Sequence, residues 1–227
     1  MTLLIKICGL KTADALDAAL DAGADLVGFV FFPPSPRHLA LADARALGAQ
    51  VKARAAKVAL TVDADDATLD AIVDALAPDM LQLHGRETVE RVAAVRQRYG
   101  LPVMKAIPVE RAADVAEAGR YAGAADRLLF DARAPREATR PGGLGTPFDW
   151  RLLENLDVDI PFMLSGGLGA RNVADALAIT QAQAVDVSSG VERAPGEKDP
   201  ELIRQFIRTA RAASDARAPG GRKKVAT

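Results

Sequence analysis

The chain has 227 residues, of which 29 are basic and 30 acidic, and its formal net charge of −1 gives no electrostatic reason to expect a nucleic-acid or membrane partner. Its one cysteine, Cys8, excludes an intramolecular disulfide and fits a reducing compartment. No secretory signal precedes the first apolar run and no apolar stretch is long enough to span a membrane, so we expect a cytoplasmic protein.

Short apolar runs alternate with longer helical patterns along the whole chain. The runs predict strands over 3–8, 26–32, 57–62, 80–84, 102–107, 127–131, 161–165 and 184–188. The helical patterns are 12–22, 40–53, 66–77, 87–99, 111–120, 149–154, 170–179 and 199–213. Strands that are apolar on both faces are typical of a buried parallel sheet, and eight βα units predict a closed (β/α)8 TIM barrel. An open doubly wound sheet is the alternative, but the first turn, CGLKT, lacks the Gly-rich pattern of that fold.

We expect one domain over residues 1–213, since no linker divides it. Thr12, Asp66 and Asp199 are suited to cap helix N-termini, and Pro200 fits the first helical position. The stretch 133–147 is the longest irregular segment, which favours a lid or binding loop. Residues 214–227 have no apolar period and predict a disordered tail.

Strand side chains alternate in direction, so one parity of each strand points into the barrel. If Cys8 points inward, the same parity also directs a set of polar side chains inward: Lys6, Gln82, His84, Lys105, Asp131, Ser165, Asp186 and Ser188. Burying such groups without partners is costly, so they either pair with one another or line a ligand pocket. The C-terminal ends of barrel strands carry the active sites of this fold, which favours the pocket.

Two glycine-containing turns follow the seventh and eighth predicted strands. Ser165-Gly166-Gly167 closes one strand and Ser188-Ser189-Gly190 closes the other. Each turn by itself is explained by a tight change of chain direction. Barrels often bind phosphate in the loops after these two strands, where glycine lets backbone N–H groups approach an anion, so the pair together favours a phosphate site.

Three further residues are candidates for chemistry. Cys8 lies at a strand end before Gly9, where a nearby Lys6 would favour a thiolate base; the alternative is an inert buried cysteine. Asp131 ends the sixth run and is either an acid or a loop carboxylate. Arg37 has the geometry to bind a carboxylate through two hydrogen bonds, although a surface charge is the alternative.

The two histidines, His38 and His84, show no metal-ligand spacing with Cys8, so we expect no metal and no cofactor. A base and an acid on nearly opposite strands suit proton transfer across a small ligand. With a phosphate site and a carboxylate-binding arginine, the ligand would be a phosphorylated sugar with an acidic aryl or similar group. Aldose–ketose isomerisation is the simplest reaction that uses these parts.

Seven segments of the chain form a characteristic set: KICGL, GFVFFPPSPR, LQLHG, LLFDA, GGLGTPFDW, FMLSGGLGARNV and VDVSSGVERAPGEKD. In this order they resemble the phosphoribosylanthranilate isomerase family of tryptophan biosynthesis. The resemblance covers residues 3–210 and leaves the tail after 213 outside the family pattern.

The resemblance implies an Amadori rearrangement of N-(5-phosphoribosyl)anthranilate to 1-(2-carboxyphenylamino)-1-deoxyribulose 5-phosphate. Asp131 would protonate the ring oxygen and help to open the ribose to a Schiff base. Cys8 would remove the proton from carbon 2, and the resulting enolamine would tautomerise to the ketone. Arg37 matches the residue that holds the anthranilate carboxylate.

The resemblance also implies how the remaining pocket residues are used. The phosphate would be held by turn residues, namely Gly142, Gly143, Gly166, Gly167, Ser189 and Gly190. Asp186 and His84 would line the pocket. The expected partner is the small-molecule substrate, with the chain acting as a monomer or homodimer.

Three other functions compete with this interpretation. Indole-glycerol-phosphate synthase has a similar fold, but it would carry a longer N-terminal segment and strand-end glutamates. The related isomerase of histidine biosynthesis would have an aspartate in place of Cys8. A barrel that only binds a sugar phosphate, as a sensor, would not need Cys8 and Asp131.

Overall fold

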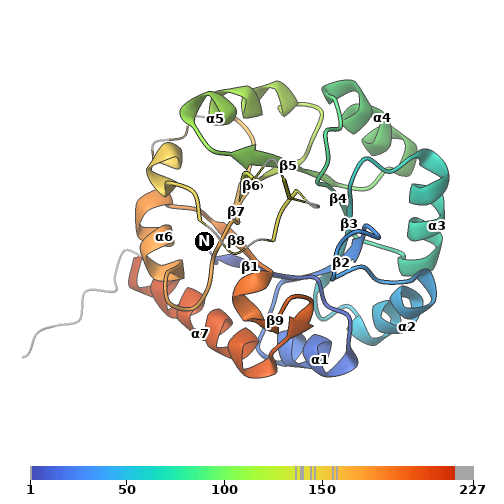
Figure 1. The fold of residues 1–227 in the computed structure, drawn as a ribbon, viewed down its shortest axis with the longest axis horizontal. Coiled ribbons are helices and arrows are strands. Elements are labelled where there is room, and N and C mark those ends of the chain that lie inside the picture. The colour runs from blue at the N-terminus through green and yellow to red at the C-terminus, as the bar shows by residue number, and fades with distance from the viewer. Residues whose placement is uncertain are drawn as a thin grey trace, which may run out of the picture.

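The computed structural model describes residues 2–135, 137–138, 141–143, 145, 147–154, 156 and 158–217. Eight parallel strands hydrogen-bond in chain order, and the last pairs with the first, so the sheet is a closed barrel. Figure 1 views the molecule from one end of this barrel, with the α-helices as an outer ring around the strands. The predicted (β/α)8 barrel is confirmed.

The elements follow the predicted alternation closely. The barrel strands are β1 (Leu4–Cys8), β2 (Leu26–Phe31), β3 (Ala56–Thr61), β4 (Met80–Leu83), β5 (Val103–Val109), β6 (Arg127–Ala132), β7 (Phe162–Leu164) and β8 (Ala184–Val187). The α-helices are α1 (Ala13–Asp21), α2 (Leu41–Val51), α3 (Asp66–Leu76), α4 (Val89–Tyr99), α5 (Ala112–Ala118), α6 (Val173–Thr180) and α7 (Pro200–Arg217). Among the described residues, short 3-10 helices are η1 (Gly119–Tyr121), η2 (Trp150–Leu153) and η3 (Ser189–Val191).

Some boundaries and elements differ from the sequence prediction. The helix expected over 149–154 is the single 3-10 turn η2, and a small hairpin, β9 (Glu192–Ala194) with β10 (Glu197–Lys198), follows β8 without having been predicted. Helix α7 continues to Arg217, four residues past the expected end at 213. The rest of the predicted tail, 218–227, lies outside the described residues, as do parts of the predicted lid over 133–147.

Side-chain oxygens at the helix starts explain where several helices begin. Thr12 accepts a hydrogen bond from the Ala15 N–H and Asp199 accepts one from the Glu201 N–H, as their cap positions predict. Helix α3 is capped by Asp65, which accepts from the Thr68 N–H at 2.9 Å, rather than by Asp66. No helix in the described part of the chain combines the length and apolar character needed to cross a membrane.

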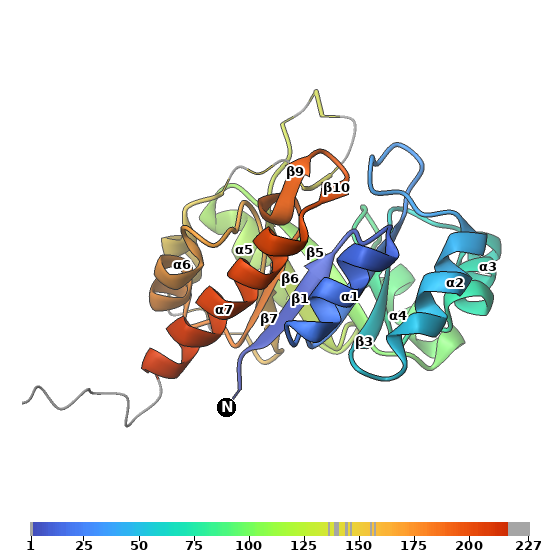
Figure 2. The same ribbon diagram turned by 90° about the horizontal axis from the view of Figure 1, so that it is seen from below.

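The barrel interior changes from apolar to polar along its axis. Its lower layers are filled by Leu26, Val58, Met104, Ala106, Leu129, Met163 and Ala184. Two residues further along the strands, the inward positions become polar, as at Lys6 and Asp186. These two residues are register partners on β1 and β8, which brings their side chains together. The loops that follow the strands, together with the β9–β10 hairpin, gather at one end of the barrel (Figure 2).

Lys105 was predicted to point into the barrel, and this prediction is wrong. On β5 the inward positions are Met104 and Ala106, whereas Lys105 shares the helix-facing side with Val103 and Ile107. The Lys105 ammonium forms an ion pair of 2.8 Å with Glu87, and both side chains are 3% exposed. Glu87 also accepts hydrogen bonds from the N–H groups of Gly85 and Asp63, so the pair fixes the loop that follows β4.

Replacing Lys105 with Met should remove the cation while keeping most of the side-chain volume. Glu87 would then be left as a buried charge without its ammonium partner, and the free energy of unfolding should fall by about 3 kcal/mol. Urea denaturation would measure the change. Arg45→Met is the matched control, because Arg45 pairs with Asp74 on the surface, where such pairs contribute little. Equal stability of the two variants would contradict a structural role for the buried pair.

Candidate active site

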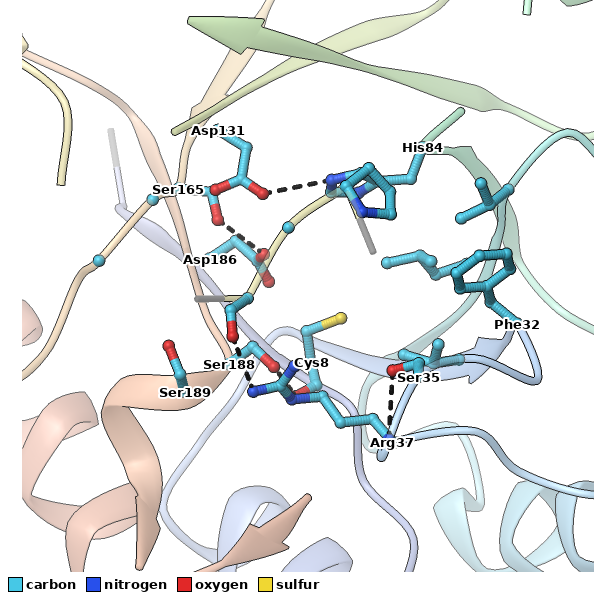
Figure 3. Close-up of a pocket in the computed structure, with 18 of the residues that line it drawn as sticks. Cys8, Phe32, Ser35, Arg37, His84, Asp131, Ser165, Asp186, Ser188 and Ser189 are labelled. Carbon is cyan, nitrogen blue, oxygen red and sulfur yellow. Dashed lines mark hydrogen bonds and ion pairs between the residues drawn. The ribbon is translucent and has the colours of Figure 1, made fainter. Parts of the chain in front are cut away.

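A cavity opens at the C-terminal end of the barrel. Most of the predicted site residues line it together: Cys8, Arg37, His84, Asp131, Gly142, Gly143, Gly166, Gly167, Asp186 and Ser189. Figure 3 shows Cys8 and Asp131 reaching into it from different strands. Gly190 is one residue beyond Ser189 and packs behind this lining.

Cys8 ends β1 with its thiol inside the barrel mouth, where the residue is only 3% exposed. Burial raises the pKa of the Cys8 thiol above its usual value, and the carboxylate of Asp186 adds to this rise. Lys6 and Lys198 act in the opposite direction without overcoming the effect of burial. Lys6 therefore favours the thiolate, as the sequence indicates, but the resting thiol at neutral pH is protonated.

A buried polar chain lies directly below Cys8. The Lys6 ammonium is fully buried and donates to Asp186 at 2.9 Å, and the Ser165 hydroxyl donates to the other oxygen of Asp186 at 3.1 Å. Burial lowers the pKa of Lys6, but the adjacent Asp186 more than offsets this and the net shift is upward. Lys6 therefore stays charged, and Asp186 is a structural partner as well as part of the cavity lining.

Asp131 lies across the cavity from Cys8, near the end of β6. One of its oxygens lies 3.2 Å from His84 Nε2, and the other accepts a hydrogen bond from the Ala132 N–H at 2.9 Å. His84 Nδ1 lies 2.9 Å from Gln82 Nε2. With the Gln82 amide donating to Nδ1, the ring proton of His84 is on Nε2 and points to the Asp131 carboxylate. The histidine thus contacts the candidate acid directly.

Arg37 is 4% exposed, which excludes the alternative of a surface charge. Its Nε and Nη2 donate to the two oxygens of Glu192 at 2.7 and 2.8 Å, and Nη2 also donates to the Gly143 carbonyl at 3.1 Å. A Cβ built on Gly143 would meet Arg37 Nη1, which identifies the side of the guanidinium that faces the loop after β6. The guanidinium is therefore held in a fixed plane at the edge of the cavity.

The two glycine turns after β7 and β8 pack against each other. Gly166 has φ +83°, a left-handed conformation that glycine adopts without strain. A Cβ on Gly190 would collide with the Leu168 carbonyl and lie 3.0 Å from Gly169 Cα, so only glycine lets the two loops approach this closely. Asn172 ties the first loop together by accepting from the Gly169 N–H and donating to the Gly167 carbonyl. The resulting rim of backbone amides is suited to an anion.

Two functional candidates were missed in the sequence. Glu192 and Lys198 belong to the β9–β10 hairpin and reach back beneath Arg37, where their side chains are 4% and 2% exposed. They lie within the VDVSSGVERAPGEKD segment, but nothing in its pattern separates them from the neighbouring surface charges. In the described part of the chain, no group of three His, Cys, Asp or Glu side chains is arranged to hold a metal ion.

The arrangement combines a thiol, a carboxylate in contact with a histidine, a fixed guanidinium and an amide-rich rim around one cavity. Residues 5–209 match the family model for N-(5'-phosphoribosyl)anthranilate (PRA) isomerase. The chain belongs to this family. It is 68% identical to N-(5'-phosphoribosyl)anthranilate isomerase from Bradyrhizobium diazoefficiens over 216 residues, which cover 95% of this chain and 97% of the relative. The family membership decides against the synthase and the histidine-pathway isomerase.

Solved structures of the family have the same fold. Phosphoribosyl anthranilate isomerase from Thermotoga maritima superposes with a TM-score of 0.84 at 32% identity, covering 93% of this chain and 100% of that one. A further family structure holds reduced 1-(o-carboxyphenylamino)-1-deoxyribulose 5-phosphate; it aligns with a TM-score of 0.79 at 30% identity and covers 93% of this chain and all of its own.

Gly28 offers a direct test of how closely the thiol is positioned. A Cβ at Gly28 would lie 2.9 Å from Cys8 Sγ and 3.1 Å from Lys6 Nζ, so Gly28→Ala should displace the thiol and lower isomerase turnover about tenfold or more. Gly119→Ala is the control, since no heavy atom lies within 4 Å of its added Cβ and its φ is −58°. Thermal melts and turnover of both variants should separate a loss of function from a loss of fold. Undiminished turnover in Gly28→Ala would mean that the exact thiol position is unimportant.

Proposed function

We propose that this cavity catalyses the family reaction through Cys8 as general base and Asp131 as general acid. The reaction is the Amadori rearrangement of N-(5'-phosphoribosyl)anthranilate to 1-(2-carboxyphenylamino)-1-deoxyribulose 5-phosphate, an isomerisation in tryptophan biosynthesis. The observation that carries the assignment is that these two side chains face one cavity from β1 and β6, with Arg37 at its edge.

The first step in this proposal is ring opening. Protonated Asp131 donates its proton to the ribose ring oxygen while the bond from that oxygen to carbon 1 breaks, and the nitrogen lone pair forms the Schiff base. His84, whose Nε2 lies 3.2 Å from an oxygen of Asp131, holds the carboxyl group in place.

The second step is proton transfer at carbon 2. The Cys8 thiolate removes this proton, and a double bond forms between carbons 1 and 2. The electrons of the former C=N bond return to the nitrogen, so the Schiff base becomes an enolamine. Return of a proton to carbon 1 and loss of the proton on oxygen 2 give the ketone, so the overall reaction is proton-neutral. Because the pKa of Cys8 is raised by burial, the thiolate fraction and the rate of this step should increase with pH.

The two ends of the substrate differ in charge and shape, and the cavity matches this difference. The glycine turns after β7 and β8 are suited to the phosphate. Gly142 and Gly143, which the resemblance also assigns to the phosphate, lie instead beside Asp131, His84 and Arg37. Arg37 is suited to the anthranilate carboxylate. Val30, Leu60 and Phe32 supply an apolar side for the aromatic ring.

All of these residues come from one chain, so the proposal holds for a monomer and for a homodimer alike. One structure of the Thermotoga maritima relative is described as monomers generated from a dimeric enzyme. The single buried cysteine fits our expectation of a cytoplasmic setting, where thiols stay reduced.

Cys8→Ala and Asp131→Asn should each lower kcat at least about a hundredfold while keeping the fold, since each removes one proton-transfer group. Substrate would be generated in situ and the loss of its fluorescence followed. Asp79→Asn is the matched control: Asp79 accepts from the Lys57 N–H at the opposite end of the barrel, so this variant should turn over normally. Full activity in either active-site variant would remove that residue from the mechanism, and an inactive intact protein would refute the assigned reaction.

A further inference from the structure

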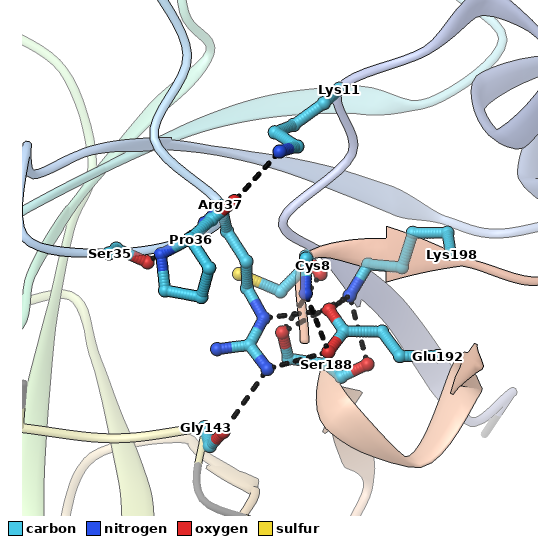
Figure 4. A network of polar contacts seen from close by, with 10 residues as sticks. Cys8, Lys11, Ser35, Pro36, Arg37, Gly143, Ser188, Glu192 and Lys198 are labelled. Atoms are coloured by element: carbon cyan, nitrogen blue, oxygen red, sulfur yellow. Dashed lines mark hydrogen bonds and ion pairs between the residues drawn. The ribbon is translucent and has the colours of Figure 1, made fainter. Parts of the chain in front are cut away.

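A cluster of three buried charges lies behind the guanidinium of Arg37. Glu192 Oε1 accepts from Arg37 Nε and from Lys198 Nζ, both at 2.7 Å, so one carboxylate bridges two cations (Figure 4). The side chains of all three residues are 2–4% exposed. Glu192 also accepts from the Gly196 N–H at 3.2 Å, which fixes the carboxylate to the turn of its own hairpin.

The net charge of this cluster affects how well Arg37 can bind an anionic ligand. Arg37 and Glu192 alone would form a neutral pair, and a ligand carboxylate would compete with Glu192 for the same guanidinium. Lys198 adds a second cation, so the cluster as a whole has a net charge of +1. In a site shielded from water, this extra charge strengthens attraction for an anion placed beside the guanidinium.

Lys198 has no hydrogen-bond donor left for a ligand. Its ammonium has three N–H groups, and the structure gives it three acceptors: the Ser188 carbonyl at 2.9 Å, the Ser188 hydroxyl at 3.2 Å and Glu192 at 2.7 Å. It therefore contributes its charge and its hold on Glu192, and it makes no direct contact with a molecule in the cavity.

We propose that Lys198 is a specificity-determining, positioning residue for the carboxylate end of the substrate. Through Glu192 it fixes the plane of Arg37, and it supplies the positive charge that lets Arg37 accept a second carboxylate. This inference rests on the proposed function, in which Arg37 binds the anthranilate carboxylate.

The charge of Lys198 can be removed by pH as well as by substitution. Burial lowers the pKa of Lys198 to about 8, with Glu192 opposing this shift and Arg37 adding to it. The groups that act on it are Glu192 on β9, Arg37 in the loop after β2, and Cys8 on β1. The ammonium is charged below this pKa and neutral above it, so binding of a carboxylate should weaken as the pH rises through about 8.

The test compares two ligands that differ only in the carboxylate. One is reduced 1-(o-carboxyphenylamino)-1-deoxyribulose 5-phosphate, and the other is the same compound without the carboxyl group. Calorimetry would give the ratio of their affinities for the intact protein and its variants. Effects on the phosphate site act on both ligands and cancel in the ratio, and effects of Cys8 ionisation are common to the intact protein and its Lys198 variants.

Lys198→Met should lower the affinity ratio about tenfold, since it removes a unit charge close to the ligand carboxylate. Lys198→Arg keeps the charge and should retain the ratio. Arg193→Met is the matched control: Arg193 is an exposed cation of the same hairpin, and its removal should leave the ratio unchanged. A Lys198→Met variant that binds both ligands equally less well would assign Lys198 a structural role only and overturn the proposal.

The intact protein gives a second test that needs no variant. Its affinity ratio should fall between pH 7 and 9.5, whereas in Lys198→Arg it should stay flat. An equal fall in the intact protein and in Lys198→Arg would also overturn the proposal, because it would assign the pH effect to another group. Arg37→Met distinguishes a failure of the proposed function from a failure of the inference about Lys198. If Arg37→Met leaves the affinity ratio unchanged, the proposed role of Arg37 itself fails. If Arg37→Met lowers the ratio and Lys198→Met does not, only the inference about Lys198 fails.

Discussion

The ion pair between Lys6 and Asp186 is the interaction on which the site depends. It joins β1 to β8, the two strands whose pairing closes the barrel, and both side chains are almost fully buried. Removing two charges from water is costly, and the cost is offset only where both partners are well hydrogen-bonded. Asp186 meets this condition because Lys6 and Ser165 occupy its two oxygens. Loss of either charge would leave the other isolated at the centre of the barrel.

The same ion pair also affects the pKa of the Cys8 thiol. A lone ammonium below the thiol would lower its pKa strongly, but Asp186 counteracts Lys6, and burial then decides the direction of the shift. The raised pKa keeps most of the thiol protonated at neutral pH, which lowers the reactivity of the only cysteine of the chain toward other molecules. Lys198 provides a second cation near the thiol from a different element, the β9–β10 hairpin.

Much of the fold and of the site was predictable because the barrel strands have a strict period of two. On β1, β4, β6, β7 and β8 the inward position changes from an apolar to a polar residue, as in the step from Met163 to Ser165. On β5 this logic failed, because both faces are apolar and the single polar residue, Lys105, pairs with Glu87 on the outside of the barrel. Parity alone gives no warning that a charged residue in a strand has a partner in a loop outside the barrel, as Lys105 has in the loop that follows β4.

Other features could not be read from the chain for a different reason. Glu192 and Lys198 lie on a short hairpin that is rich in charged residues, and its neighbours Arg193 and Glu197 are indeed exposed. The position at which the hairpin packs on the barrel decides which of its charged side chains point inward. That position depends on the folded barrel and not on the sequence of the hairpin. The end of α7 is a similar case, since a polar final turn gives no apolar period and yet continues the helix to Arg217.

The distribution of polar and apolar side chains around the barrel mouth gives the cavity one polar wall and one apolar wall. β6, β7 and β8 place Asp131, Ser165 and Asp186 on one side of the cavity, whereas Val30 on β2 and Leu60 on β3 pack with Cys8 on the other. The two carboxylates thus lie on one wall, and the thiol lies against apolar side chains. A ligand with a sugar phosphate at one end and an aromatic ring at the other meets both kinds of wall in this cavity. In the mechanism we propose, the sugar lies between the thiol of Cys8 and the carboxyl group of Asp131, so the difference between the two walls favours the productive orientation.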